Sequence, residues 1–203
     1  MTISSVVNQF VFDPADNTRL FVATTMGIFE SKNGGEQWQK RMDGMKEVLM
    51  VVTLAMDPVR PDILYAGTSG GVYKSVNQAG RWEKINNGLV SPKELTSSRS
   101  LGVTVMGVDP FSPDTVYAAT LSGIYKSTNG GQRWERIAES MPDQMISAMV
   151  LDRATAGTLY VASREGVYKS LDGGVTWQAI NKGLATLNIR SLAQSAIDPR
   201  ILY

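Results

Sequence analysis

The sequence predicts an all-β fold: a β-propeller of four-stranded antiparallel blades, with four blades and part of a fifth in an incomplete ring. Two observations carry this prediction. A phrase that begins with glycine and ends with tryptophan occurs four times, and all four tryptophans of the chain belong to it. A second landmark, an aspartate that ends a β-type segment, keeps the same spacing. The copies of the phrase cover residues 27–38, 71–82, 123–134 and 166–177.

The two landmarks stay in phase along the whole chain. Successive tryptophans are 44, 52 and 43 residues apart, and the first four aspartates repeat these steps. A period in this range is typical of propeller blades, and it divides the chain into repeating units. We expect one partial propeller over 1–203, with units 1–46, 47–100, 101–143 and 144–188 and a partial unit 189–203. The landmarks are Trp38, Trp82, Trp134 and Trp177, and Asp13, Asp57, Asp109, Asp152 and Asp198.

Four short β-type segments follow one another in each unit, as the second unit illustrates. The first, 52–56, ends at Asp57-Pro58, because proline fixes φ and lacks an N–H group. Turn residues 68–70 separate the next two segments, 63–67 and 71–75. The last segment, 82–85, ends at an Asn-Asn-Gly sequence. No helix is predicted, and residues 43–51 are assigned to a loop.

The composition excludes several classes of function. Twenty basic and nineteen acidic residues leave a net charge of +1, so neither nucleic-acid binding nor direct membrane insertion is expected. The chain has no cysteine and no histidine, which excludes thiolate zinc sites, cysteine nucleophiles and imidazole-dependent triads. We therefore expect no metal and no cofactor. No signal peptide is visible, and no run approaches the roughly 18 apolar residues of a membrane span.

The end of the repeated phrase resembles a known motif. Residues 31–38, 127–134 and 170–177 are similar to the Asp-box, or BNR repeat, Ser-x-Asp-x-Gly-x-x-Trp. This motif occurs in sialidases, xyloglucanase-type glycosidases, sortilin-like receptors and photosystem II stability/assembly factor-like propellers. Two of these copies have asparagine for aspartate, and the copy at 75–82 has Ala79 where the motif has glycine. The motif residues are Ser31, Asn33, Gly35, Trp38, Ser75, Asn77, Trp82, Ser127, Asn129, Gly131, Trp134, Ser170, Asp172, Gly174 and Trp177.

We interpret these boxes as structural. Asn-Gly and Asp-Gly favour tight β-turns, so each box is predicted to join the third and fourth strands of a blade. The short Asn or Asp side chain can bond nearby backbone N–H groups, and the tryptophan can fold under the turn as an apolar plug. A carbohydrate or calcium site at each box is the alternative, but four copies on four blades favour a device that builds the fold.

A second repeated pair, Tyr-Lys, stands in the third strand of three units. Because successive strand residues point to opposite faces, the two side chains do not form one surface. We expect the tyrosine to pack between blades and the lysine to be solvated. The pairs are Tyr73-Lys74, Tyr125-Lys126 and Tyr168-Lys169.

Binding is expected on the face opposite the boxes, as the family resemblance implies for propellers. Arg164 and Glu165 offer charge in a turn on that face. The second unit also carries about eight extra residues, and an insertion in one unit often maps to a binding face. Lys93, Glu94 and Arg99 of this insertion could engage a protein or a sugar. A serine-rich loop with no role is the alternative.

The sequence favours a non-catalytic scaffold for protein binding or assembly. Glycosidases need two carboxylates across a cleft, and no acidic pair outside the repeat stands in a recognisable catalytic context, so no catalytic residue is assigned. The resemblance is greatest to assembly-factor-like and sortilin-like propellers, which implies a protein partner or larger complex and favours an exported location. The alternative is a fragment of a carbohydrate-active propeller, either a xyloglucanase-type hydrolase or a glycan-binding module.

The two ends of the chain predict an open ring. Unit one begins with a first strand at 6–12, whereas 201–203 align with the middle of a second strand. An open end would expose apolar blade faces and an unpaired strand edge. We expect neighbours or another segment to cover them.

Overall fold

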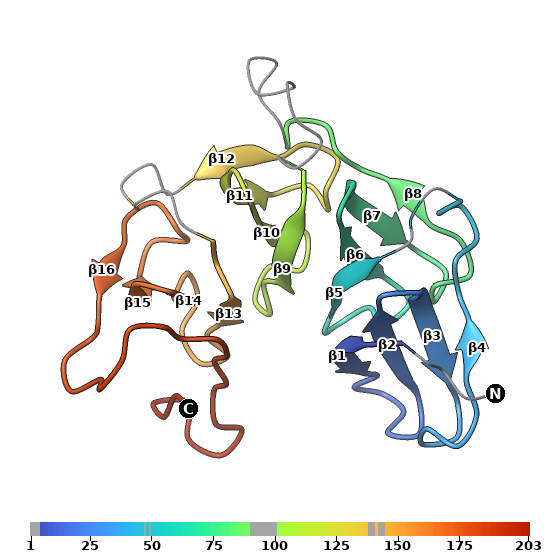
Figure 1. Ribbon diagram of the computed structural model, residues 1–203, viewed down its shortest axis with the longest axis horizontal. Helices are drawn as coiled ribbons and strands as arrows, with labels where there is room; N and C mark the ends of the chain where they lie inside the picture. Colours follow the sequence, from blue (N-terminus) through green and yellow to red (C-terminus); the bar gives the residue numbers. More distant parts are fainter. Residues whose placement is uncertain (1–4, 47, 49, 90–100, 138–140, 142–144) are drawn as a thin grey trace.

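The computed structural model describes residues 5–46, 48, 50–89, 101–137, 141 and 145–203. Within these residues, four sheets of four antiparallel strands lie as blades along an open arc (Figure 1). Each sheet uses four consecutive strands, with the first nearest the centre of the arc and the last at its periphery. The prediction of an all-β fold with four-stranded antiparallel blades is confirmed. The described residues contain no helix long and apolar enough to span a membrane.

The strands of the first two blades have similar lengths. Blade 1 contains β1 (Val7–Phe12), β2 (Leu20–Thr24), β3 (Gly27–Ser31) and β4 (Gln39–Lys40). Blade 2 contains β5 (Val51–Met56), β6 (Leu64–Thr68), β7 (Gly71–Ser75) and β8 (Glu83–Lys84).

The other two blades repeat this plan. Blade 3 contains β9 (Val103–Val108), β10 (Val116–Thr120), β11 (Gly123–Ser127) and β12 (Glu135–Ile137). Blade 4 contains β13 (Ala148–Leu151), β14 (Leu159–Ser163), β15 (Gly166–Ser170) and β16 (Gln178–Ala179).

The second strand of each blade is buried at every position, whereas the short fourth strands are largely exposed. A strand that is covered on both faces has a nearly continuous apolar sequence, as in Leu-Tyr-Ala-Gly-Thr of β6. The blades therefore stack face to face, and the core of the molecule lies between them.

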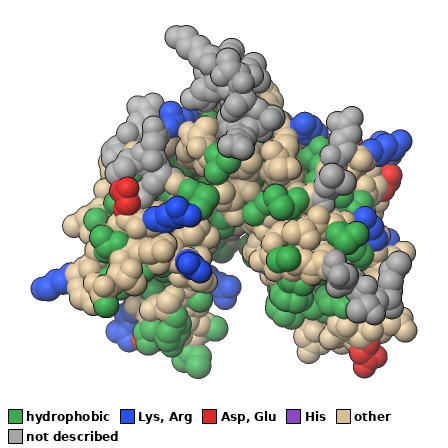
Figure 2. Space-filling view, viewed as in Figure 1, with side chains coloured by type: hydrophobic (Ala, Val, Ile, Leu, Met, Phe, Trp, Pro, Cys, Tyr) green, Lys and Arg blue, Asp and Glu red, His purple; other side chains and the backbone are tan. Residues whose placement is uncertain are grey.

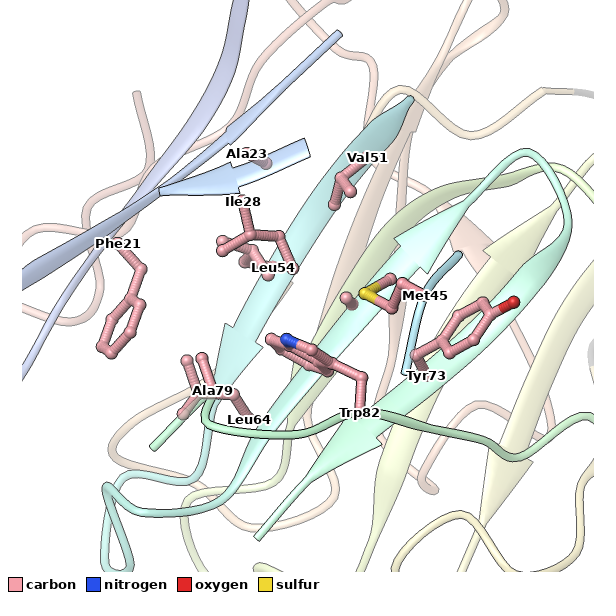
Figure 3. Packing of buried hydrophobic residues seen from close by; sticks show 11 residues of the cluster. Phe21, Ala23, Ile28, Met45, Val51, Leu54, Leu64, Tyr73, Ala79 and Trp82 are labelled. Carbon is pink, nitrogen blue, oxygen red and sulfur yellow. The ribbon is translucent and has the colours of Figure 1, made fainter. Parts of the chain in front are cut away.

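Three hydrophobic clusters join the four blades in sequence. Figure 3 shows the first, in which Phe21 and Ile28 of blade 1 approach Leu54 and the indole of Trp82 in blade 2. Met45, from the loop between the two blades, packs beside that indole. The second cluster joins blades 2 and 3, and the third joins blades 3 and 4. Each blade is thus held by its neighbours along the chain.

The two ends of each blade carry different turns. At one end, a hydroxyl closes the turn between the second and third strands: Thr24 Oγ1 donates to the Gly27 carbonyl at 2.9 Å and accepts from Met26 N at 3.0 Å. Thr68, Thr120 and Ser163 repeat these bonds. We call this end of the molecule the turn face. The opposite end, which carries the Asp-boxes, is the box face.

The repeated aspartates shape turns on the box face. Asp57 Oδ1 accepts hydrogen bonds from Val59 N and Arg60 N, both at 2.9 Å, and its other oxygen accepts from Arg60 Nε at 2.8 Å. Such an Asx turn satisfies backbone donors where the proline ends the strand. The other landmark aspartates accept equivalent backbone bonds.

After blade 4 the chain forms a short hairpin. Ala193 and Tyr203 exchange two backbone hydrogen bonds of 3.0 and 2.8 Å, and Gln194 bridges to Leu202. This hairpin lies beside β13, because Gln194 Oε1 accepts from Arg153 N at 3.1 Å. Hydrophobic side chains lie on both sides of the opening of the arc (Figure 2). Exposed apolar residues of β1 and of the hairpin include Val7, Phe10, Phe12, Ile197, Ile201 and Tyr203.

Candidate functional site

An apolar groove lies on the turn face between blades 2 and 3. We call it the blade 2–3 groove; its volume is about 450 Å³. It is lined by Met50, Val52, Ser69, Gly102, Val103, Thr104 and Leu121.

Four segments from two blades build this groove. Met50 and Val52 come from the start of β5, and Ser69 comes from the turn after β6. The start of β9 forms the opposite wall, beside Leu121 in the turn after β10. A 3.1 Å hydrogen bond from Leu121 N to the Gly102 carbonyl fixes that turn against β9. The two walls therefore rest on strands and on hydrogen-bonded turns.

The chemistry of the lining suits an apolar group. Val103 is buried in the floor, whereas Met50 and Leu121 remain 38% and 51% exposed on the walls. The Thr104 hydroxyl donates to the Ala119 carbonyl at 3.3 Å within its own blade. The described lining contains neither a carboxylate nor an aromatic ring. The groove can hold an apolar side chain, which flexible methionine and leucine side chains can follow in shape, but its lining offers no acid or base.

Sequence reasoning did not single out this groove. Met50 and Leu121 are apolar residues in segments predicted as loop or turn, and this apolar character was the available signal. Predicted binding residues Arg164 and Glu165 are exposed on the same face, in the turn between β14 and β15 of blade 4. They do not line the groove. The other predicted residues, Lys93, Glu94 and Arg99, lie outside the described residues.

Each Asp-box forms the same hydrogen-bonded loop after the third strand. In blade 1, Ser31 Oγ donates to Asn33 Oδ1 at 3.0 Å and accepts from Gly35 N at 2.9 Å, while Asn33 Oδ1 also accepts from Gln37 N at 2.9 Å. The boxes of the other three blades repeat these contacts. Their polar groups serve the loop itself. The described residues contain no group of three or more Asp or Glu side chains that could hold a metal ion.

The aspartate of the fourth box is the most strongly bound. Asp172 accepts from the hydroxyl of Thr176, from its backbone N–H and from the Ser170 hydroxyl. These bonds favour the charged carboxylate, and they lower the pKa of Asp172 to about 2.

The tryptophans of the second and third boxes connect blades. Trp82 Nε1 donates to the Arg41 carbonyl at 3.1 Å, and Trp134 Nε1 donates to the Ile85 carbonyl at 2.7 Å. Both rings are almost fully buried, whereas Trp38 and Trp177 are half-buried. In the three boxes with two glycines, the ring lies below the second glycine, as expected: a Cβ on Gly35, Gly131 or Gly174 would stand 3.6 Å from the ring of Trp38, Trp134 or Trp177.

The prediction that the repeated lysines are solvated was wrong for Lys74 and Lys126. Lys74 Nζ donates to the carbonyl of Gly130, in the box of blade 3, at 2.9 Å. The hydroxyl of Tyr65, opposite Lys74 in the sheet, approaches the same oxygen at 3.4 Å. Burial lowers the pKa of Lys74 and raises that of Tyr65 to about 12.

The same contact joins blade 3 to blade 4. Lys126 Nζ and the Tyr117 hydroxyl lie 3.4 and 3.3 Å from the carbonyl oxygen of Gly173. The strand register pairs Tyr117 with Lys126, as it pairs Tyr65 with Lys74. A cross-strand Tyr-Lys pair on one blade therefore binds the box of the next blade.

In blade 1 other residues occupy the positions of the Tyr-Lys pair, and this blade packs against the degenerate box of blade 2. Phe21 and Glu30 occupy the cross-strand positions, and Glu30 is buried between Arg19 and Arg41 with N–O distances of 2.6 to 2.8 Å. In the box of blade 2, Gln78 and Ala79 adopt φ values of 60° and 62°, where the other boxes have glycine pairs. The box conformation thus survives without its glycines.

Comparisons with known proteins place this fold among propellers of the Asp-box type. Neither a scan against protein-family models nor a search of curated proteins gave a match. Among solved structures, an ancestral GH74 enzyme is 26% identical, with a TM-score of 0.69, over 86% of this chain and 24% of that one. The GH74 xyloglucanase of Xanthomonas campestris is 19% identical, with a TM-score of 0.74, over 95% of this chain and 33% of that one.

YCF48 from Cyanidioschyzon merolae is a second kind of neighbour. It is 17% identical, with a TM-score of 0.67, over 95% of this chain and 61% of its own. A structure of YCF48 bound to D1 peptide matches at 12% identity and a TM-score of 0.66, over 95% of this chain and 60% of that one. The chain thus spans about a quarter to a third of the GH74 structures and about three fifths of the YCF48 structures. The propeller fold is shared with both groups, as the Asp-box resemblance predicted.

Proposed function

We propose that the chain is a non-catalytic binding scaffold that holds an apolar segment of a protein partner in the blade 2–3 groove. The lining of the groove carries this proposal. Its exposed walls are methionine and leucine, which suit adaptable contacts with apolar side chains. Its described lining offers no carboxylate for glycoside hydrolysis and no aromatic ring on which a sugar could stack.

Charged residues on the turn face would complete the binding surface. Arg164 and Glu165 are exposed on that face, and they would supply a polar rim outside the apolar centre. Lys93, Glu94 and Arg99 are proposed as further contacts from the insertion. The neighbour YCF48 was solved with a bound D1 peptide, which supports peptide binding as a use of this fold.

A selection experiment tests this function. Peptides selected from a displayed random library against the whole chain are expected to contain an apolar anchor. Leu121→Asp should weaken their binding at least tenfold, because a buried carboxylate without a partner opposes the apolar anchor. Val76→Asp is the matched control, since Val76 is 61% exposed in the box after β7, on the box face. Peptides that bind both variants equally well would contradict the proposal.

A carbohydrate-active function is the second candidate. The 26% identity to an ancestral GH74 enzyme over 86% of the chain favours it. Because the chain covers only 24% of that enzyme, residues outside this segment would have to contribute to any catalytic site. Affinity electrophoresis in xyloglucan gels separates the two functions. Retardation that Leu121→Asp leaves unchanged would favour a glycan site elsewhere on the chain.

A further inference from the structure

The outward face of blade 4 repeats the surface by which blades 2 and 3 hold their successors. We call this surface the blade 4 socket; its residues are Tyr160, Lys169, Ile180, Gly183 and Leu184. At each position, an equivalent residue in an earlier blade contacts the box or the tryptophan of the next blade. The polar and the apolar parts of the socket provide separate evidence.

The polar part is a cross-strand Tyr-Lys pair. Tyr160 pairs with Lys169 in the sheet, and the ammonium nitrogen lies 5.3 Å from the centre of the tyrosine ring. The corresponding distance between Lys74 and Tyr65 is also 5.3 Å. Lys74 donates to a box carbonyl, whereas Lys169 Nζ and the Tyr160 hydroxyl have no hydrogen-bond partner among the described residues.

The apolar part follows the fourth strand. Leu184 is 43% exposed, although the equivalent Leu89 of blade 2 is completely buried against blade 3. Gly183 has a φ of +89°, which matches the +87° of Gly88. A Cβ on Gly88 would stand 2.1 Å from the carbonyl oxygen of Trp134, whereas a Cβ on Gly183 would meet nothing within 4 Å. Gly183 thus keeps the conformation that admits a neighbouring tryptophan.

The socket also selects the sequence of its partner. The Cδ1 atom of Ile85 would lie 2.3 Å from a Cβ on Gly131, so Ile85 would have to move if the box beside it had alanine at that position. Arg41 replaces this isoleucine in blade 1, where its side chain turns to Glu30, and the facing box carries Ala79. Ile180 stands at the same place in blade 4, three residues after its tryptophan. The blade 4 socket therefore matches a box with two glycines.

The place nearest the centre of the arc beside blade 4 is already filled. Ser147 Oγ donates to the Ile189 carbonyl at 2.6 Å, and Gln194 accepts from Arg153 N at 3.1 Å. In blade 1, β1 holds the corresponding place beside blade 2, because Gln9 Oε1 accepts from Leu54 N at 3.0 Å. Blade 1 of a second copy would therefore collide with the hairpin at 193–203. The hairpin supplies two strands, so two more would make a sheet of four strands like those of the other blades.

We infer that the blade 4 socket binds a two-stranded Asp-box hairpin with a Gly-Gly turn and a closing tryptophan. The first strand of this hairpin adds to the free edge of residues 201–203, and its turn places a glycine carbonyl against Lys169 and Tyr160. Its tryptophan covers Gly183 and Leu184. The resulting fifth sheet would have four strands, as the other blades do.

A synthetic peptide with the sequence of residues 166–182 is a suitable probe, because it contains a Gly-Gly box and its tryptophan. Its binding to the whole chain can be followed by amide NMR shifts. We expect saturable shifts at Gly183 and Leu184. Lys169→Met should weaken the affinity about tenfold, through loss of a charged hydrogen bond. Lys84→Met, at an exposed lysine on β8, is the matched control and should leave the affinity unchanged.

A second pair of variants tests the selection for glycine. A peptide with alanine at the second box glycine should bind at least tenfold more weakly, and Ile180→Ala should recover part of that loss. Three outcomes would overturn the inference: no saturable binding at about 1 mM peptide, shifts outside the socket, or affinities indifferent to Lys169 and to the box glycine. Concentration-dependent dimerisation that Trp38→Ala prevents would also overturn it, since the occupant would then be a second copy.

Discussion

Lys74 donates a 2.9 Å hydrogen bond to the carbonyl oxygen of Gly130, 56 residues further along the chain and in the next blade. The bond is charge-assisted and half-buried, so Lys74→Met should lower the free energy of unfolding by about 1–2 kcal/mol. Lys169→Met supplies the control within the same fold, because Lys169 has no such acceptor among the described residues. Urea unfolding measures both. Equal destabilisation by the two changes would show that the contact with the next blade is not the cause.

Glu30 is the buried anion on which blade 1 depends. Its carboxylate is held by Arg19 and Arg41. Glu30→Gln leaves Arg41 without this counter-ion and leaves Arg19 with only the longer 3.7 Å contact to Asp13, so the substitution should cost about 3 kcal/mol. Glu135→Gln is the control, because the Glu135 contact with Arg133 is exposed and should contribute less than about 0.5 kcal/mol. Thermal unfolding in low and high salt compares them. A loss that disappears in high salt would argue against a buried ion pair.

The backbone of Gln78 has a positive φ, in the left-handed region that residues with a side chain rarely adopt. Gln78→Gly should raise the free energy of unfolding by about 0.5–1 kcal/mol, since relief of the strain exceeds the entropic cost of glycine. Val76→Gly in the same box is expected to destabilise, because Val76 has no positive φ to relieve. Chemical denaturation of both variants gives the sign of each change. A destabilised Gln78→Gly variant would contradict this account.

The protonation of Asp172 in the fourth box should make the stability of the fold depend on pH. Its pKa is lowered to about 2 in the folded chain, and the Thr176 hydroxyl is the largest cause. The unfolded chain therefore binds this proton more readily, and stability is lost as the pH falls from about 4 towards 2. Thr176→Val should raise the pKa of Asp172 towards its ordinary value and weaken this dependence. A carboxyl titration by NMR measures the pKa, and an unchanged value in Thr176→Val would contradict the assignment.

Much of the fold follows from periodicity. Blades of four strands are predicted by the spacing of Trp82 and Trp134 and by the turn signals after each strand. Short segments with alternating apolar residues between Gly, Asn and Asp turns are compatible with few other folds. The short-range hydrogen bonds within a box could be predicted equally well from the sequence. Ser75 and Asn77 bond within a few residues of themselves, so their roles depend little on the rest of the fold.

Contacts between blades could not be predicted in the same way. Tyr73 and Lys74 are adjacent in sequence, but the pair that acts together is Tyr65 and Lys74, which the strand register brings side by side. Their acceptor, Gly130, belongs to another unit, and its position depends on how two blades stack. The blade 2–3 groove has the same origin, because its walls come from two units whose separate patterns give no sign of a shared hollow.

The sequential arrangement of the three hydrophobic clusters makes the molecule a one-dimensional lattice. Blade 2 and blade 3 each contribute to two clusters. Within the described residues, blade 1 and blade 4 each contribute to one. In such a lattice, stability is approximately a sum of nearest-neighbour terms, and its terminal members open first. Loosening should therefore begin at the outer blades and progress inward, one blade at a time, while the two central blades remain folded longest.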